Sequence, residues 1–159
     1  MSDDVHELSS GFCRLDGLGV VITGSSSGVG RAMAWELSRA GARVLVHCRR
    51  SVESAESLVE SIRSSGGEAH LLVADLSDTG EADAMLEHSW QALGRVDAWV
   101  NNAGVDLLTG EESSWGFDEK LAALWEVDVR ATIRLAREAG RRMHEAEGGV
   151  VLNIGWDQA

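Results

Sequence analysis

The feature that most constrains the fold is a short apolar run that leads directly into a stretch rich in glycine and serine. Residues 19–23 read Gly-Val-Val-Ile-Thr, and residues 24–30 read Gly-Ser-Ser-Ser-Gly-Val-Gly. A continuous apolar run of this length is typical of a strand that is buried on both faces of a parallel sheet. A helical pattern begins within the glycine-rich stretch. The sequence therefore predicts a strand, a tight turn and a helix in immediate succession.

The three glycines of this turn have separate predicted roles. Gly24 allows a sharp turn off the strand, Gly28 lets backbone approach a pyrophosphate without a Cβ, and Gly30 permits close packing of helix on strand. The start of the helix offers unpaired N–H groups and the positive end of the helix dipole to the phosphates. The predicted dinucleotide-binding turn consists of Gly24, Ser26, Ser27, Gly28, Val29 and Gly30.

Other interpretations of the turn are distinguished by its surroundings. A loop that merely turns a corner explains the glycines but not their place between a strand and a helix. A triphosphate-binding loop ends in Gly-Lys followed by Ser or Thr, whereas Gly30 is followed by Arg31 and Ala32. A methyltransferase shares this kind of sheet and turn, so the turn alone does not exclude that class.

Strand and helix patterns alternate along the rest of the chain. Apolar spacing predicts further strands and helices, with Ser77-Asp78 as an N-cap and a loop over 105–116. The predicted strands cover 19–23, 44–46, 69–73, 96–100 and 150–154, and the predicted helices cover 29–40, 51–64, 77–93 and 118–146. Such alternation requires crossover connections. The predicted fold class is therefore α/β, a doubly wound, Rossmann-type parallel sheet of about five strands with helices on both faces, truncated after the fifth strand.

Composition narrows the classes of function. With 159 residues, 44% of them hydrophobic, we expect one domain over 17–159 after a polar leader at 1–16. A net charge of −12 disfavours nucleic acid and anionic membranes as partners. The start has no signal-peptide pattern, and no apolar run approaches the roughly 20 residues that span a bilayer. Cys13, Cys48 and five scattered histidines predict neither a disulfide framework nor a metal site. We expect a cytoplasmic protein.

The end of the second predicted strand bears on the choice of dinucleotide. An NAD-selective site places a carboxylate about 20 residues beyond the glycines, where it accepts from the ribose 2′-OH. Residues 47–50 instead read His-Cys-Arg-Arg. Arg49 and Arg50 would attract a 2′-phosphate and hold it by charge-assisted hydrogen bonds, so NADP is favoured over NAD. In the alternative interpretation the two arginines are only solvated or pair with Glu53.

These motifs resemble those of the short-chain dehydrogenase/reductase family. The glycines, with Thr23 ahead of them, match the family pattern T-G-x-x-x-G-x-G, and residues 101–104 read Asn-Asn-Ala-Gly, like its N-N-A-G element after the fourth strand. The resemblance covers about residues 15–155. It implies NADP-linked oxidation or reduction of a small alcohol/carbonyl pair, with hydride supplied by the cofactor.

The resemblance also assigns further cofactor residues. Asn102, Ala103 and Gly104 belong to the element that lines the cofactor ribose in the family. Asp75 and Leu76 follow the third predicted strand, where the family holds the adenine.

The chain departs from the family pattern on the catalytic elements. Asp128 takes the place of an Asn in the long helix and is the candidate catalytic residue that the resemblance suggests. Gly155-Trp156 stands where the family has a serine after the fifth strand. The family's Y-x-x-x-K would lie beyond residue 159, and this chain has no Tyr and a single Lys, Lys120. Without that pair, acid–base help worth roughly 10²- to 10⁴-fold is lost, so we expect the chain alone to be inactive.

Two further expectations follow. The chain could instead be a non-catalytic NADP(H)-binding module, or a decayed or truncated relative of such enzymes. A sheet that stops at its fifth strand has an unpaired edge, and apolar surface left exposed invites association. We therefore expect a homo-oligomer formed through the long helix at 118–146.

Overall fold

A computed structural model describes residues 14–155, which are built around a five-stranded parallel sheet. The strand order is β3-β2-β1-β4-β5. The strands are β1 (Gly19–Ile22), β2 (Arg43–Cys48), β3 (Ala69–Val73), β4 (Ala98–Asn101) and β5 (Val150–Asn153). The chain runs outward from β1 to β3 and then crosses back to place β4 on the other side of β1. This order confirms the predicted doubly wound α/β sheet.

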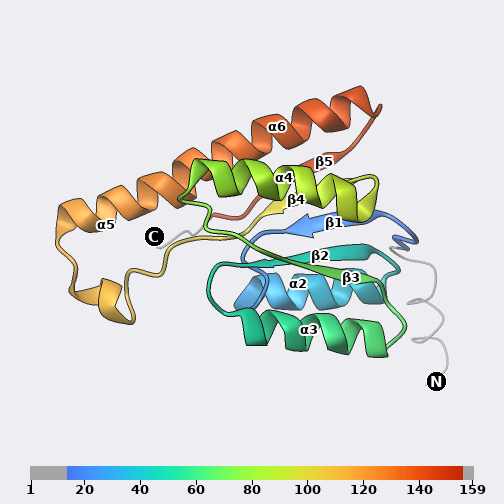
Figure 1. Cartoon of the computed structure of the whole chain (residues 1–159), viewed down its shortest axis with the longest axis horizontal. Helices are drawn as coiled ribbons and strands as arrows, with labels where there is room; N and C mark the ends of the chain where they lie inside the picture. The colour runs from blue at the N-terminus through green and yellow to red at the C-terminus, as the bar shows by residue number, and fades with distance from the viewer. Residues whose placement is uncertain (1–13, 156–159) are drawn as a thin grey trace, which may run out of the picture.

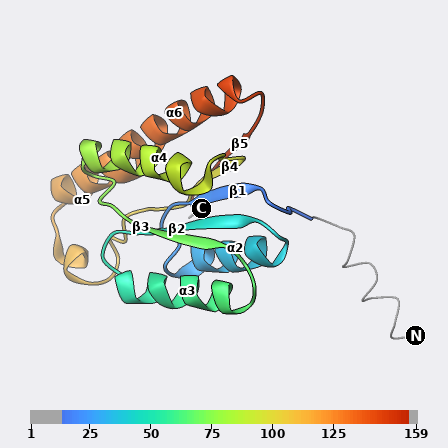
Figure 2. The same ribbon diagram turned by 45° about the vertical axis from the view of Figure 1, so that its right-hand side comes forward.

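Helices cover both faces of the sheet (Figures 1 and 2). One layer contains α2 (Gly28–Arg39) and α3 (Val52–Ser64), and the opposite layer contains α4 (Thr79–Leu93) and α6 (Thr132–Glu145). A short 3₁₀ helix, η1 (Glu111–Ser114), lies within the predicted loop. Asp78 is the N-cap of α4, as predicted, and its side chain accepts from the Glu81 N–H.

The sheet is the boundary between two apolar cores. Val20 and Ile22 of β1 pack in the cluster that includes Leu58 of α3, whereas Val21 packs in the cluster that includes Leu135 of α6. Every residue of β1 is buried, so both faces of the strand need apolar side chains. This arrangement explains the continuous, rather than alternating, apolar run in the sequence.

The long helix predicted over 118–146 is one uninterrupted run with a change of winding in its middle. It consists of α5 (Phe117–Leu124), the π-helical segment η2 (Trp125–Ala131) and α6. Both views show α5 reaching out past the strands (Figures 1 and 2), and none of its residues is buried. The apolar residues predicted to form one face of this helix therefore differ in burial. The Leu135 side chain is 1% exposed, whereas the Leu121 side chain is 51% exposed.

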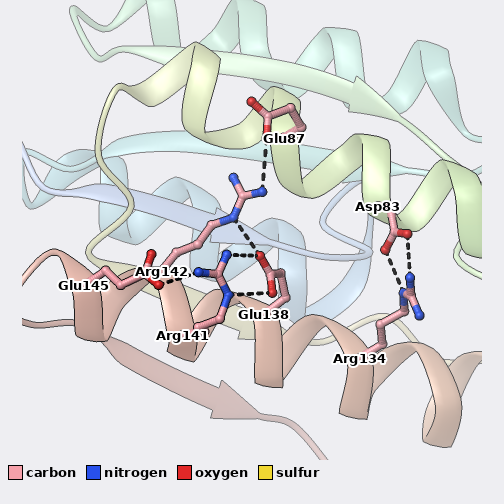
Figure 3. Close-up of polar contacts among 7 residues, drawn as sticks. All are labelled: Asp83, Glu87, Arg134, Glu138, Arg141, Arg142 and Glu145. Carbon is pink, nitrogen blue, oxygen red and sulfur yellow. Dashed lines mark hydrogen bonds and ion pairs between the residues drawn. The ribbon is translucent and has the colours of Figure 1, made fainter.

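Charged side chains link the outer faces of α4 and α6 (Figure 3). Arg134 of α6 donates to both carboxylate oxygens of Asp83. About two turns further on, Arg142 donates to Glu87 of α4 (3.0 Å) and to Glu138 of its own helix (3.1 Å). Arg142 also lies over the Trp90 ring, 5.1 Å from its centroid. The rim of this helix pair is therefore ionic, while its inner side is apolar.

Several element boundaries differ from the prediction by one or two residues; β2 covers Arg43–Cys48 instead of 44–46, and β4 starts at Ala98 instead of residue 96. Just before β4, the Asp97 carboxylate accepts the Gly19 N–H (2.8 Å). The predicted leader at 1–16 lies mostly outside the described residues, although Leu15 donates its N–H to the Ala40 carbonyl (2.7 Å). Among residues 14–155, none of the helices has the length and apolarity needed to cross a bilayer.

Candidate functional site

The glycine-rich turn joins β1 to α2, as predicted. Gly24 and Gly28 have positive φ angles of 63° and 54°, a conformation that L side chains rarely adopt. The first hydrogen bond of α2 runs from the Arg31 N–H to the Ser27 carbonyl (3.0 Å), and the Ser27 side chain makes no capping bond. The N–H groups ahead of Arg31 are therefore in position to bind an anion.

The three glycines of the turn face different surroundings. A Cβ on Gly28 would meet nothing within 4 Å. A Cβ on Gly24 would lie 2.8 Å from the Ala103 Cα, and one on Gly30 would lie 2.7 Å from the Gly24 carbonyl oxygen and closer still to the Asn102 amide. Gly30 thus packs against the turn itself. Gly28 is the glycine that leaves open space in front of the helix start, and a ligand could fill that space.

A hollow of about 490 Å³ lies beside the turn, between the starts of α2 and α3. Ser26, Ser27 and Gly28 line it from the turn, and Ser54 lines it from α3. Arg31 also lines it and donates to the Ser54 carbonyl (2.8 Å). The hollow therefore combines hydroxyl groups, free amide groups and the Arg31 guanidinium, which suit a phosphorylated ligand, with one carboxylate, that of Glu53.

The turn is hydrogen-bonded to the Asn-Asn-Ala-Gly segment that follows β4. Thr23 accepts the N–H groups of Asn102 and Ala103 on its Oγ1, each at 2.9 Å. The Asn102 amide nitrogen donates to the carbonyls of Thr23 (2.9 Å) and Gly24 (3.1 Å). These bonds close the gap between the carboxyl ends of β1 and β4, the place where the strand order reverses and where such sheets bind ligands.

His47 joins the turn to the other side of the sheet, and the sequence motifs did not reveal this role. Its Nδ1 accepts the Gly24 N–H (3.0 Å), and its Nε2 lies 3.0 Å from the Ala74 carbonyl oxygen. Ser25 donates to the Ile22 carbonyl (2.7 Å) and accepts the His47 N–H (3.0 Å). His47 and Ser25 are 2% and 0% exposed. Buried polar side chains need hydrogen-bond partners, so a polar residue at a position expected to be buried was the sequence signal available for this role.

The two arginines after β2 pair with groups other than Glu53. Arg49 Nη1 lies 3.9 Å from a carboxylate oxygen of Asp75, and Arg50 Nη1 lies 3.6 Å from one of Glu112. Arg50 is largely exposed. Both guanidiniums therefore stand at the carboxyl edge of the sheet with weak, solvent-accessible partners that a phosphate could replace.

The segment after β3 is fixed by its own hydrogen bonds. Asp75 accepts the N–H (2.9 Å) and the hydroxyl (2.6 Å) of Ser77. Partial burial raises the pKa of Asp75, but these bonds and the charges of Arg49 and Arg50 outweigh it, so the pKa is lower than usual. Leu76 is 6% exposed and packs in the core under α4. The segment thus has a charged residue at the surface and an apolar anchor beneath it.

Asp128 lies on η2 and faces the other end of the site. Its Oδ2 accepts the Val105 N–H (3.2 Å), and a Cβ on Gly104 would lie 2.9 Å from its Oδ1. Partial burial raises the pKa of Asp128, and the backbone hydrogen bonds only partly offset the effect. The structure thus brings Asp128 to the Asn-Asn-Ala-Gly segment. Within the part of the chain that the structure describes, no group of His, Cys, Asp and Glu is arranged to hold a metal ion.

Comparisons with known proteins agree with this geometry. The family model for short chain dehydrogenase matches residues 19–157. A short-chain dehydrogenase/reductase from Pestalotiopsis microspora is 37% identical over 139 residues, which are 87% of this chain and 51% of that protein. The chain spans about half the length of the curated relatives that it matches.

Solved structures show the same likeness. A metagenomic short-chain oxidoreductase in complex with NADP has a TM-score of 0.79 and 35% identity, covering 89% of this chain and 63% of that one. A 7α-hydroxysteroid dehydrogenase complexed with NADH has a TM-score of 0.79 and 30% identity, covering 89% and 54%. Together with the family match over residues 19–157, these likenesses establish that the chain belongs to the short-chain dehydrogenase/reductase family.

Proposed function

We propose that this chain is the cofactor-binding part of an NADP-preferring oxidoreductase that acts on an alcohol/carbonyl pair. The observation that carries the proposal is the space in front of Gly28, which has a positive φ and no neighbour that a Cβ would meet within 4 Å. The free N–H groups at the start of α2 face a ligand there. A diphosphate, which needs several donors and close approach of backbone, fits this place.

The residues around the turn would each hold a different part of the dinucleotide. The N–H groups of Gly28, Val29 and Gly30 would bind the diphosphate, assisted by Ser26 and Ser27. The segment at 75–76 would hold the adenine and the segment at 102–104 a ribose. When bound, the cofactor supplies the hydride. This chain's residues would bind and orient it.

Arg49 and Arg50 support the preference for NADP over NAD. A 2′-phosphate carries more charge than the carboxylates that these arginines now face, and guanidinium binds phosphate in a bidentate manner. One structural neighbour is complexed with NADP and another with NADH, so the family fold accepts both cofactors. We expect tighter binding of NADPH than of NADH, and we expect the Arg49→Ala/Arg50→Ala double variant to lose the difference.

The proposal is tested by titrating the chain with NADPH and following the fluorescence of the reduced nicotinamide. Gly28→Trp places an indole in the open space and should weaken binding at least about tenfold, since it removes the interactions of a charged group with several donors. The matched control is Gly94→Trp. Gly94 also has a positive φ, 69°, and a Cβ there would also meet nothing within 4 Å, but it caps α4 away from the turn. Equal binding by both variants would overturn the proposal.

A non-catalytic NADP(H)-binding module is the second candidate, and one observation favours it. Gly155 is followed by Trp156 where the family has a serine. Asp128 is a carboxyl group next to the segment proposed to hold a ribose, and we propose that it orients residues 104–105. NADPH binding without any turnover of simple ketones would favour the module. Turnover that Asp128→Ala abolishes would favour an enzyme.

We also propose that a second copy of the chain covers the exposed apolar side of the long helix. Phe117, Leu121, Trp125 and Ile133 are between 51% and 78% exposed along one continuous helix. Sedimentation velocity should show a dimer that Leu121→Glu dissociates, and a clean monomer would contradict this. The domain bounds of 17–159 and the cytoplasmic location stay predictions.

A further inference from the structure

The buried imidazole of His47 can satisfy its two partners in one form only. The Gly24 N–H is a donor, so Nδ1 must carry a lone pair. The Ala74 carbonyl is an acceptor, so Nε2 must carry the proton. The neutral Nε2–H tautomer is therefore the form that makes both hydrogen bonds. A doubly protonated ring would turn an N–H toward the N–H of Gly24.

The two partners of this ring belong to the two ends of the proposed cofactor site. Gly24 opens the turn that would bind the diphosphate, and Ala74 directly precedes the Asp75-Leu76 segment that would hold the adenine. Arg49 lies two residues beyond His47 on the same chain segment and pairs with Asp75. Backbone bonds between Ser25 and His47 complete the junction (Ser25 N–H to the His47 carbonyl, 2.8 Å).

We propose that His47 is a positioning residue for the dinucleotide, whose neutral ring holds the phosphate-binding turn in register with the segment after β3, so that protonating it weakens cofactor binding. This inference rests on the proposed function and adds a regulation to it. The ring lies beneath the phosphate-binding turn and does not need to touch the cofactor. Its effect reaches the ligand through the position of the Gly24 amide and of residues 74–76.

The surroundings of the ring keep it neutral. The Gly24 N–H and the Ala74 carbonyl are the backbone groups that contact the ring, the Ser25 hydroxyl accepts the His47 backbone N–H, and Asp75, after β3, is the charged side chain whose field reaches the ring. Burial lowers the pKa of His47, while the Ala74 carbonyl and Asp75 act in the opposite direction. A folded-state pKa below the ordinary value means that the folded chain binds fewer protons than the unfolded one. The folded chain therefore loses stability as the pH falls below the ordinary histidine pKa of about 6.5.

Two variants distinguish loss of the hydrogen bond to the Gly24 N–H from simple loss of a buried side chain. His47→Asn has an amide oxygen near the position of Nδ1 and can still accept the Gly24 N–H, but it cannot reach Ala74. His47→Leu keeps the apolar volume and makes neither bond. Both variants therefore lose the bond to Ala74, and they differ in the bond to Gly24.

The experiment measures the Kd of NADP⁺ by calorimetry between pH 8 and pH 5 for the wild-type chain and both variants, with circular dichroism as a check on folding. At pH 8 we expect His47→Leu to bind about tenfold more weakly than wild type and His47→Asn within about threefold. Between pH 7 and pH 5 the wild-type Kd should rise several-fold more than that of His47→Asn. The 2′-phosphate of the ligand titrates equally with both proteins, so the difference between them isolates the ring.

The outcomes are distinguishable. No binding of NADP⁺ or NADPH by the wild-type chain at pH 8 would reject the proposed function itself. If the wild-type chain binds NADP⁺ but its Kd depends on pH in the same way as that of His47→Asn, the role of His47 is overturned and the proposed function is not. If His47→Leu does not fold, the pH comparison with folded His47→Asn still decides. Nitrogen chemical shifts of the imidazole that show protonated Nδ1 at pH 8 would also overturn it.

Discussion

The two halves of the sheet differ in how completely the chain covers them. In the half formed by β1, β2 and β3, one of the five residues of the outer strand β3 is exposed, namely Val73. In the half formed by β4 and β5, Val150 and Leu152 of the outer strand are 53% and 50% exposed. No residue of α5 is buried.

The parts of the candidate site also differ in their surroundings. Ser25 and His47, next to the turn proposed to bind the diphosphate, make buried hydrogen bonds. Asp128, the candidate catalytic residue, lies on a π-helical segment between α6, which has a buried inner face, and α5, which has no buried residue. Such segments are often found at functional sites.

The largest contrast should appear within the long helix itself. Leu135→Ala removes a side chain that is 1% exposed and should cost about 2–5 kcal/mol of unfolding free energy. Leu121→Ala, at a side chain 51% exposed, should change it by less than about 0.5 kcal/mol in a sample dilute enough to be monomeric, and by more where the proposed dimer forms. Urea unfolding of both variants measures the comparison. A loss at Leu121 as large as that at Leu135 would show that the exposed side of α5 is covered in solution.

The next effect tests the closure between β1 and β4. Thr23→Val keeps the shape of the side chain but leaves the N–H groups of Asn102 and Ala103 without an acceptor, at a cost of about 2–4 kcal/mol. Thr23→Ser retains the hydroxyl and should lose much less. NADPH affinity should follow the same order, because the two segments line the proposed site. Equal stability of the two variants would argue against this closure.

A smaller effect is expected at Asp128, and it has a defined dependence on pH. Burial raises the pKa of this carboxyl, so the folded chain holds its proton to higher pH than the unfolded chain does. Stability is therefore gained as the pH falls through the folded-state pKa and is lowered above it. Asp128→Asn should be more stable than wild type at pH 7 by less than about 1 kcal/mol. Thermal unfolding should show the gap closing near pH 4, and a gap independent of pH would contradict the assignment.

The smallest effect is expected at the ionic rim of α4 and α6 (Figure 3). Hydrogen bonds from Arg141 and Arg142 lower the pKa of Glu138 to about 2 from an ordinary 4.5. The stabilisation by the ion pairs of Glu138 is therefore complete above pH 4.5 and is lost as the pH falls toward 2. Glu138→Gln should lower the Tm slightly at pH 7 in low salt, and by less in 1 M salt, since exposed pairs are screened. A larger loss in high salt would refute this account.

The sequence predicted the sheet and the turn because local patterns determine both. Apolar runs marked the strands, and glycines at 24, 28 and 30 marked the turn between β1 and α2. The differing burial of Leu121 and Leu135 could not be predicted, since both fit one apolar face and only the width of the sheet beneath decides which is covered. The π-helical winding of η2 was equally hidden, because a hydropathy pattern does not record which carbonyl an N–H reaches.

Part of the site was beyond the motifs for a related reason. The bonds of Thr23 to Asn102 and of His47 to Gly24 join residues 79 and 23 positions apart. Their partners are backbone groups, which every residue has, so no residue type in the sequence marks them. A histidine in an otherwise apolar strand was the visible sign that a buried partner exists.

The account's central claim is that the start of α2 binds the phosphates of a dinucleotide. Mapping backbone amide chemical shifts of the ¹⁵N-labelled chain during a titration with NADP⁺ tests it most directly. The account predicts the largest shifts at Gly28, Val29 and Gly30, with a second group at 75–76. Saturable shifts confined to α5 and α6, or none at the turn at millimolar NADP⁺, would contradict it.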